Sequence, residues 1–152
     1  MTTTLVTVGV DLGAESREAV RWAARYSEAM GARLRAVTVW EVRARPVGPG
    51  QMMTPATDLI PPEDMQSSAA DRLDEVLGES LDAEQTREVE KHVVPGDPAT
   101  VLLERSADAE VLVLGNGHHG ALGGALTGSV ALHCLHHAEC PVVLVPAPQG
   151  RG

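Results

Sequence analysis

Two loops combine glycine with polar side chains directly after predicted strands, and in this 152-residue chain they are the segments best suited to ligand chemistry. The first, residues 11–13 (DLG), begins with Asp11. The second, residues 115–120 (GNGHHG), is rich in glycine, and the pair Gly128-Ser129 follows it at the start of a predicted helix. Glycine lets backbone N–H groups approach a ligand closely, and the first N–H groups of a helix attract anions. The pattern therefore predicts a cradle for phosphate groups.

The second loop also matches Gly-x-Gly-x-x-Gly, the pattern of dinucleotide-binding loops. Three features argue against that site. The motif follows the fourth predicted strand, Gly123 and Gly124 disfavour the helix that should come next, and no acidic strand end follows at the expected distance. The P-loop pattern is absent, and the only lysine, Lys91, lies in another predicted strand. Phosphate charge must then be met by backbone amides, a metal ion, or His118 and His119.

Hydrophobic periodicity predicts the elements that position these loops. β-branched and apolar runs indicate strands over residues 5–10, 34–40, 88–94, 111–114 and 142–145. Apolar residues at spacings of three and four indicate helices between them, with Ser16 and Asp97 as expected N-caps and Gly31 as an expected C-terminal glycine. The last two helices are expected over residues 98–106 and 129–137. Residues 41–62 are expected to form a long flexible loop, and residues 147–152 a tail.

Strands that alternate with helices form parallel sheets covered on both faces. We therefore predict an α/β fold with three layers: a doubly wound, Rossmann-like open sheet of five parallel strands in the order 3-2-1-4-5, with four helices. Residues 1–152 are expected to form a single domain. In such a sheet a ligand binds where the strand order reverses, which here lies between the first and fourth strands. Both polar loops follow those strands.

Composition excludes several classes of function. The chain carries 12 basic and 21 acidic residues, for a formal net charge of -9, which argues against binding nucleic acid or anionic lipid. No apolar run approaches the length of a membrane span, and the first residues lack a signal-peptide pattern, so we expect a cytoplasmic protein without a membrane partner. There is no Phe, one Tyr and two Trp, so any adenine ring must be held by aliphatic and backbone contacts.

Several stretches together resemble the universal stress protein family, over nearly the whole chain. They are residues 8–11 (VGVD), 96–99 (GDPA), 114–115 with 128–130 (LG and GSV), and 136–142 (HHAECPV). Members of that family that bind ATP carry Gly-x2-Gly-x9-Gly-[Ser/Thr] after the fourth strand. In the same register this chain has Gly115, then His118 in place of the second glycine, then Gly128-Ser129.

The resemblance implies a set of contacts to ATP or AMP, with Mg²⁺ or Mn²⁺ as an accompanying ion. Asp11 would lie near the ribose or the adenine edge, and the backbone of Val39 would contact adenine. The ribose and phosphates would be surrounded by Leu114, Gly115, Gly128, Ser129 and Val130. Gly117 and His118 occupy contact positions at which the residue types differ from those of the family.

Two departures from the family pattern bear on the phosphate end. Histidine adopts a positive φ less readily than the family glycine, so His118 weakens the expectation of ATP binding. Gly117, one position earlier, offers the loop another flexible point, and the imidazole of His118 could itself meet a phosphate. After Asp11 the chain has Leu12-Gly13, where a Gly-Ser pair is more usual.

We therefore expect an adenine-nucleotide-binding protein that acts in stress response or regulation through ligand-dependent states, without being an enzyme. One alternative is a nucleotide-independent interaction module of the same family. The family forms homodimers, and the last strand, Val142 to Val145, would offer its free edge to a second copy. A second alternative is an enzyme that hydrolyses ATP, although residues 11–16 contain neither Ser-Gly-Gly-x-Asp-Ser nor His-x-Gly-His.

Histidine and cysteine also gather near the end of the chain, at helical spacing that could suit a metal ion. His133, His136, His137 and Cys140 would share one face of a helix. Pro141 pushes the residue before it out of helical geometry, so Cys140 should leave that face. We expect no metal site there, and reduced structural roles for Cys134 and Cys140.

Overall fold

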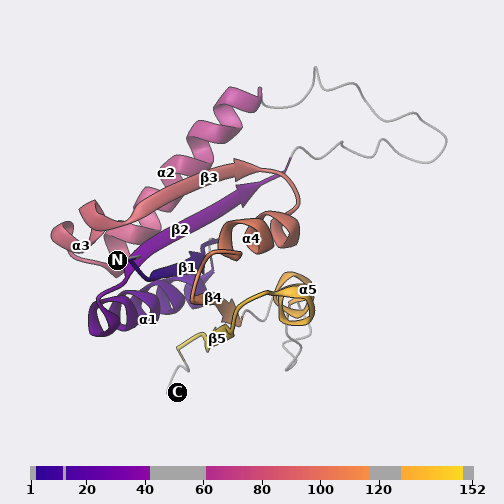
Figure 1. Ribbon diagram of the computed structural model, residues 1–152. Helices are drawn as coiled ribbons and strands as arrows, with labels where there is room; N and C mark the ends of the chain where they lie inside the picture. The colour runs from indigo at the N-terminus through magenta and orange to yellow at the C-terminus, as the bar shows by residue number, and fades with distance from the viewer. Residues whose placement is uncertain (1–2, 12, 42–60, 117–127, 149–152) are drawn as a thin grey trace.

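The computed structural model describes residues 3–11, 13–41, 61–116 and 128–148. Within these residues the chain alternates strands with helices (Figure 1). The strands are β1 (Leu5–Gly9), β2 (Arg33–Trp40), β3 (Glu90–Pro95), β4 (Val111–Asn116) and β5 (Val142–Pro146). The helices are α1 (Ala14–Met30), α2 (Pro62–Ser80), α3 (Ala83–Glu88), α4 (Pro98–Ser106) and α5 (Ser129–His137).

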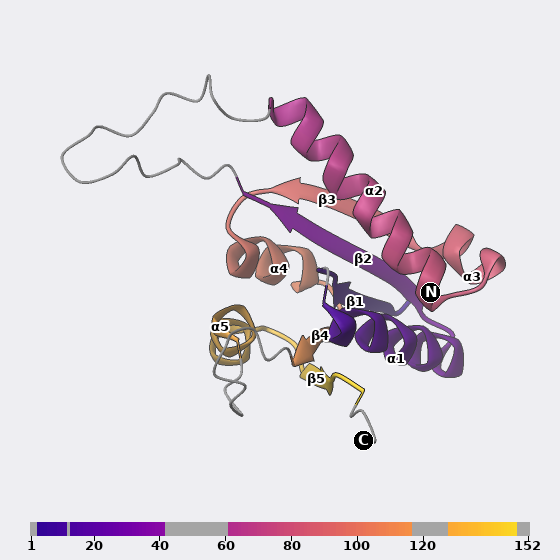
Figure 2. The same cartoon turned by 180° about the vertical axis from the view of Figure 1, so that it is seen from behind.

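The strands form one parallel sheet in the order β3-β2-β1-β4-β5, as the sequence predicted. β1 lies at the centre, paired with β2 from Leu5 opposite Arg33 and with β4 from Val6 opposite Val111. α1 and α2 cover one face of the sheet, and α4 and α5 cover the other (Figures 1 and 2). The structure thus confirms the doubly wound topology with its reversal between β1 and β4.

The described residues contain five helices, so the prediction of four was wrong. The additional helix, α3, has six residues and begins at Asp82 with a capping box. The Asp82 carboxylate accepts a hydrogen bond from the Gln85 N–H, and the Gln85 side chain accepts one from the Asp82 N–H. None of its residues is buried. A helix stabilised by its cap and not by an apolar face shows no hydrophobic periodicity.

Helix ends differ from the predictions in one place and agree in others. Ser16 is not an N-cap, because α1 begins two residues earlier, after Gly13. Gly31 does end α1 with a left-handed φ of 65°, and Asp97 caps α4 by accepting a hydrogen bond from the Thr100 N–H. The third strand begins at Glu90 instead of residue 88, since α3 occupies the residues before it. Most of the predicted loop 41–62 and the end of the predicted tail lie outside the described residues.

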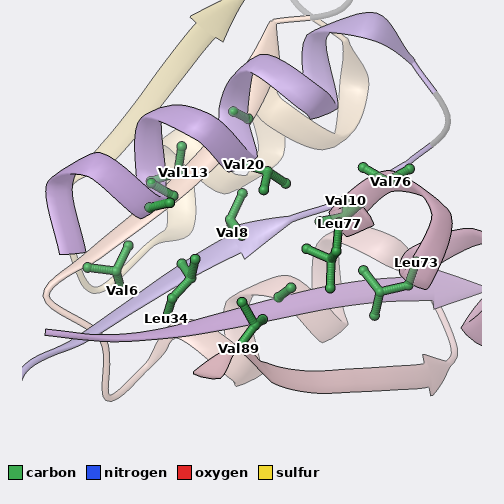
Figure 3. Packing of buried hydrophobic residues seen from close by; sticks show 14 of the residues in the cluster. Val6, Val8, Val10, Val20, Leu34, Leu73, Val76, Leu77, Val89 and Val113 are labelled. Atoms are coloured by element: carbon green, nitrogen blue, oxygen red, sulfur yellow. The ribbon is translucent and has the colours of Figure 1, made fainter. Parts of the chain in front are cut away.

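Alternation along the strands divides the core into two clusters. Val6, Val8 and Val10 face α1 and α2, where they pack with side chains such as Val20, Leu73, Leu77 and Val113 (Figure 3). The intervening positions face α4 and α5, where Val37, Leu112 and Leu114 pack with Leu102 and Cys134. Because these side chains are almost all aliphatic, valine-rich strands fill both clusters without a phenylalanine.

Candidate functional site

The candidate site lies at the carboxyl ends of β1 and β4, the two strands between which the order of the sheet reverses. After β1 the chain turns into α1 on one face, and α5, which precedes β5, lies on the other face. The helices that follow β1 and β4 thus lie on opposite faces of the sheet, with the ends of these strands between them. This is the general position of ligand sites in doubly wound sheets.

A cavity of about 400 Å³ occupies this position. Of the nine predicted contact residues, seven are described, and all seven line this cavity: Asp11, Val39, Leu114, Gly115, Gly128, Ser129 and Val130. They come from the ends of β1, β2 and β4 and from the start of α5. Gly117 and His118 lie outside the described residues. The structure thus brings the described residues together, while their role in binding stays a prediction.

Sequence reasoning missed other lining residues. They are Gly9, Val10, Ser16, Val37, Pro98, Leu102 and Ala131. Val37 could have been found from alternation, since it lies two positions from the predicted contact residue Val39 on the same strand. Pro98 and Leu102 belong to α4, which begins after β3 and packs over β2 and β1. Only the tertiary structure reveals that approach.

The Asp11 carboxylate is fixed by hydrogen bonds within its own loop. One oxygen, Oδ1, accepts hydrogen bonds from the Gly13 N–H at 2.7 Å and from the Ser16 hydroxyl at 2.9 Å. The Ser16 hydroxyl in turn accepts one from the Asp11 N–H at 2.8 Å. Ser16 is buried and is the third residue of α1, so its hydroxyl bonds to this loop and does not cap the helix. The carboxylate is therefore held in place at the cavity wall before any ligand arrives.

Gly115 allows α1 to begin close against β4. A Cβ atom at this position would lie 2.5 Å from the Glu15 Cγ and 2.9 Å from the Glu15 carbonyl carbon. Both distances are shorter than side chains tolerate, and the second contact is to backbone. Glycine is thus required here by packing, and the approach brings the first turn of α1 to the cavity edge.

Gly128 is a different case, because no described atom lies within 4 Å of a Cβ built on it. Its φ of -57° is also open to any residue. It is the N-cap of α5, and as a glycine it offers no side-chain acceptor to the N–H groups of the first turn. The first N–H groups of α5 therefore lie at the cavity, with open space beside Gly128 among the described residues, and a helix N-terminus of this kind attracts anions.

Charge is sparse in this cavity. Asp11 is the only charged residue among the described residues that line it. The remaining lining is aliphatic, glycine, or small and polar. A phosphate group placed here would be held by backbone N–H groups and hydroxyls, with no arginine or lysine in the described wall.

The histidines and cysteines near the end of the chain lie in surroundings that differ from those of the cavity. Among the described residues, no three potential ligands are gathered closely enough to hold a metal ion. The rings of His133 and His137 contact each other, with 4.4 Å between centroids. Both cysteines are free thiols. Burial raises the pKa of Cys134 to about 11 and also raises the pKa of Cys140, so both thiols are predominantly protonated and poorly nucleophilic near neutral pH.

A doubly wound sheet with a cavity at its reversal point defines a class of ligand-binding α/β proteins, and the comparisons identify the family. The model of the universal stress protein family matches residues 3–146, so the chain belongs to this family. A universal stress protein of Mycolicibacterium smegmatis is 34% identical over 142 residues, which make up 92% of this chain and 47% of the relative. One from Mycobacterium tuberculosis is 31% identical over 146 residues, 92% of this chain and 46% of the relative. The chain thus spans about half the length of these relatives.

Solved structures confirm the fold. A universal stress protein in complex with cAMP superposes with a TM-score of 0.67 at 21% identity, covering 95% of this chain and 98% of that one. A universal stress protein from Archaeoglobus fulgidus in complex with dAMP gives a TM-score of 0.55 at 22% identity, covering 95% and 99%. In the part of this chain that the structure describes, no helix is long and apolar enough to cross a membrane.

Proposed function

We propose that this protein binds an adenine nucleotide, ATP or AMP, in the cavity between β1 and β4, and that it acts in stress response or regulation through ligand-dependent states. The observation that carries the proposal is the convergence of seven predicted contact residues on one cavity that extends to the start of α5. The nucleotide complexes of two structural neighbours, one with cAMP and one with dAMP, support an adenine ligand.

The lining suggests how such a ligand would lie. The phosphates would meet the N–H groups at the start of α5, near Gly128 and Ser129. The base would lie at the other end, against aliphatic groups of Val39, Pro98 and Leu102. The Asp11 carboxylate, fixed between these ends, would accept hydrogen bonds from the ribose. His118 and Gly117 would complete the phosphate loop.

A divalent ion, Mg²⁺ or Mn²⁺, fits this wall only as a companion of the phosphates. Mg²⁺ in nucleotide sites commonly takes one or two carboxylates, with phosphate oxygens and water as the other ligands. The described wall offers the Asp11 carboxylate and the Ser129 hydroxyl. Bound there, the ion would neutralise phosphate charge, because the described wall has no basic side chain to do so.

Binding without turnover is the function we propose, in the cytoplasm. Catalytic loops of related nucleotide hydrolases and adenylyl transferases follow the first strand, and residues 11–16 here match neither pattern. The Asp11 carboxylate is instead engaged with Gly13 and Ser16. Product release from ATP in proportion to protein, and its loss in Asp11→Ala, would support the alternative of an ATP-hydrolysing enzyme.

Calorimetric titration with ATP and AMP tests the proposal. We expect binding by the wild-type protein and none by Gly128→Glu, because a carboxylate at this position would occupy the open space and repel phosphate. Gly128→Ala is the matched control, since a Cβ meets no described atom there and φ is compatible. This variant should fold and retain binding. Absence of binding by the wild-type protein at millimolar nucleotide would overturn the proposal.

One observation favours a second candidate, a nucleotide-independent dimeric module. Among the described residues, β5 pairs only with β4 and ends the sheet. Its other edge is therefore open to a second copy of the protein. It spans Val142–Pro146, one residue beyond the predicted interface from Val142 to Val145. Light scattering after size exclusion at micromolar concentration should show a dimer with or without nucleotide. A monomer would contradict this candidate.

A further inference from the structure

A second cavity adjoins the candidate nucleotide site. Its volume is about 460 Å³, and it lies on the α1 and α2 side of the sheet edge. The two cavities share four lining residues: Val10, Asp11, Val39 and Pro98. The second cavity then extends beneath the first turns of α2, where Met65, Ala69 and Leu73 line it. It is therefore adjacent to the first cavity along the wall at the ends of β1 and β2.

The wall of the second cavity is mostly apolar and its charges do not favour phosphate. Met65, Ala69 and Leu73 face it from α2, and Trp40 lines it from the end of β2. The indole N–H of Trp40 donates to the Gln66 side chain, so the ring is held in place with its polar atom satisfied. Among the described residues of the wall, the charged ones are Asp11, Glu41 and Arg72, with one more acid than base. A neutral, apolar group suits this wall better than an anion.

The position of the cavity determines which part of a nucleotide could reach it. This step rests on the proposed function, in which phosphates lie at the start of α5 and the base lies against Val39. The lining that the two cavities share includes Val39, against which the base is proposed to lie. A group attached through the phosphates, such as the second half of a dinucleotide, would extend away from it. A group on the base, which lies against Val39 in the proposed arrangement, can extend toward α2.

We propose that the second cavity is a specificity subsite that receives an apolar substituent on the adenine base. The ligand class is thus a base-modified adenine mononucleotide, with the unmodified nucleotide as a weaker ligand. Val10 and Val39 form the wall across which the substituent passes, and Met65, Ala69 and Leu73 provide the apolar contacts.

Comparing AMP with N6-benzyl-AMP by calorimetry tests this subsite. We expect N6-benzyl-AMP to bind the wild-type protein about tenfold or more tightly than AMP, because the ring removes apolar area from water on both sides. Met65→Trp should fill the cavity and abolish this preference while AMP still binds. Ser67→Trp is the matched control, because Ser67 is exposed on the same helix turn and lies outside the cavity wall. This variant should keep the preference.

The outcomes separate this inference from the proposed function. If AMP binds but N6-benzyl-AMP binds more weakly to the wild-type protein, the subsite is wrong and the nucleotide site stands. A preference that persists unchanged in Met65→Trp would also overturn the subsite. If neither compound binds, the proposed function fails and this inference fails with it. The wild-type comparison decides the matter even if Met65→Trp does not fold.

Fluorescence provides a second readout. The chain has two tryptophans, and Trp22 stacks on Tyr26 in α1, away from both cavities. In a Trp22→Phe background, Trp40 reports on the second cavity alone. N6-benzyl-AMP should change its emission at saturation by more than AMP does. Equal changes would contradict a ligand group beside the indole.

Discussion

Arg35 and Val39 lie four residues apart on the same face of β2, yet their surroundings differ completely. Arg35 is near the start of the strand, and its guanidinium donates to the Arg105 carbonyl at 2.9 Å and pairs with Glu90 and Asp108. Val39 is near the end of the strand, where it lines both cavities. One face of one strand thus passes from a charged network to an apolar wall.

The charged network also includes the next strand and α4. The Glu90 carboxylate accepts a hydrogen bond from His92, whose other ring nitrogen accepts one from Arg105 at 2.9 Å. Since arginine can only donate, His92 carries its proton on Nε2 in this arrangement. At the site end the fixed groups are instead backbone N–H groups, one carboxylate and one buried hydroxyl. Long charged side chains thus stabilise one end of the sheet, and the close approach of backbone segments shapes the other end.

The sharpest test of this contrast is Gly115→Ala, for which we expect the largest effect. The added Cβ would meet Glu15 at 2.5 Å, so the first turn of α1 must shift, and the free energy of unfolding should fall by about 1 to 3 kcal/mol. Nucleotide affinity should fall with it. Gly78→Ala is the matched control, because it lies within α2 with open space around its Cβ. This change should raise stability by about 0.5 to 1 kcal/mol. Urea denaturation measures both, and equal effects would contradict the packing role of Gly115.

A smaller effect is expected at the charged end, from Arg35→Met. Its side chain is only 11% exposed, so the substitution keeps the packing of the stem but removes the donor to the Arg105 carbonyl. Glu90 and Asp108 are exposed enough to regain water. We expect a loss of about 1 to 2 kcal/mol in the free energy of unfolding. Nucleotide affinity measured by calorimetry should not change. A loss of binding would show that the two ends of the strand are coupled.

The smallest effect is a pH dependence at Glu90. The hydrogen bond from His92 and the nearby Arg35 guanidinium lower the pKa of the Glu90 carboxyl below its usual value of 4.5. A lowered pKa in the folded state adds stability above the unfolded pKa, and this contribution is lost as pH falls through the folded pKa. Glu90→Gln should therefore be less stable than wild type at pH 7, and the two proteins should converge as pH falls below about 4.5. Thermal denaturation from pH 7 to pH 3 measures the difference. A constant gap over this range would contradict the role of the charge.

Sequence patterns predicted the features that depend on periodicity and loop chemistry. Valine-rich alternation in β1 and the apolar run of β4 defined the centre of the sheet, and the loops after them defined the site edge. α3 was missed because its stability comes from the Asp82 capping box and not from burial. Ser16 was placed as a cap from its residue type alone, whereas the structure uses its hydroxyl to hold Asp11.

The rest of the site could not be predicted because it depends on helices packing from a distance. Pro98 and Leu102 line the cavity only because α4 packs across β2 and β1. The second cavity depends on where α2 begins relative to the end of β2. Neither approach leaves a signal in local residue spacing.

The central place of β1 also has a consequence for the order in which the protein can assemble during synthesis. β1, β2 and β3 are neighbours in the sheet and are all made within the first 95 residues, so this half can pair early. β1 lacks its second neighbour until β4 is made, and α5 follows later still. On the ribosome, the Asp11 loop would therefore be made long before the start of α5. The cavity proposed to bind a nucleotide therefore cannot be complete until α5 has been made.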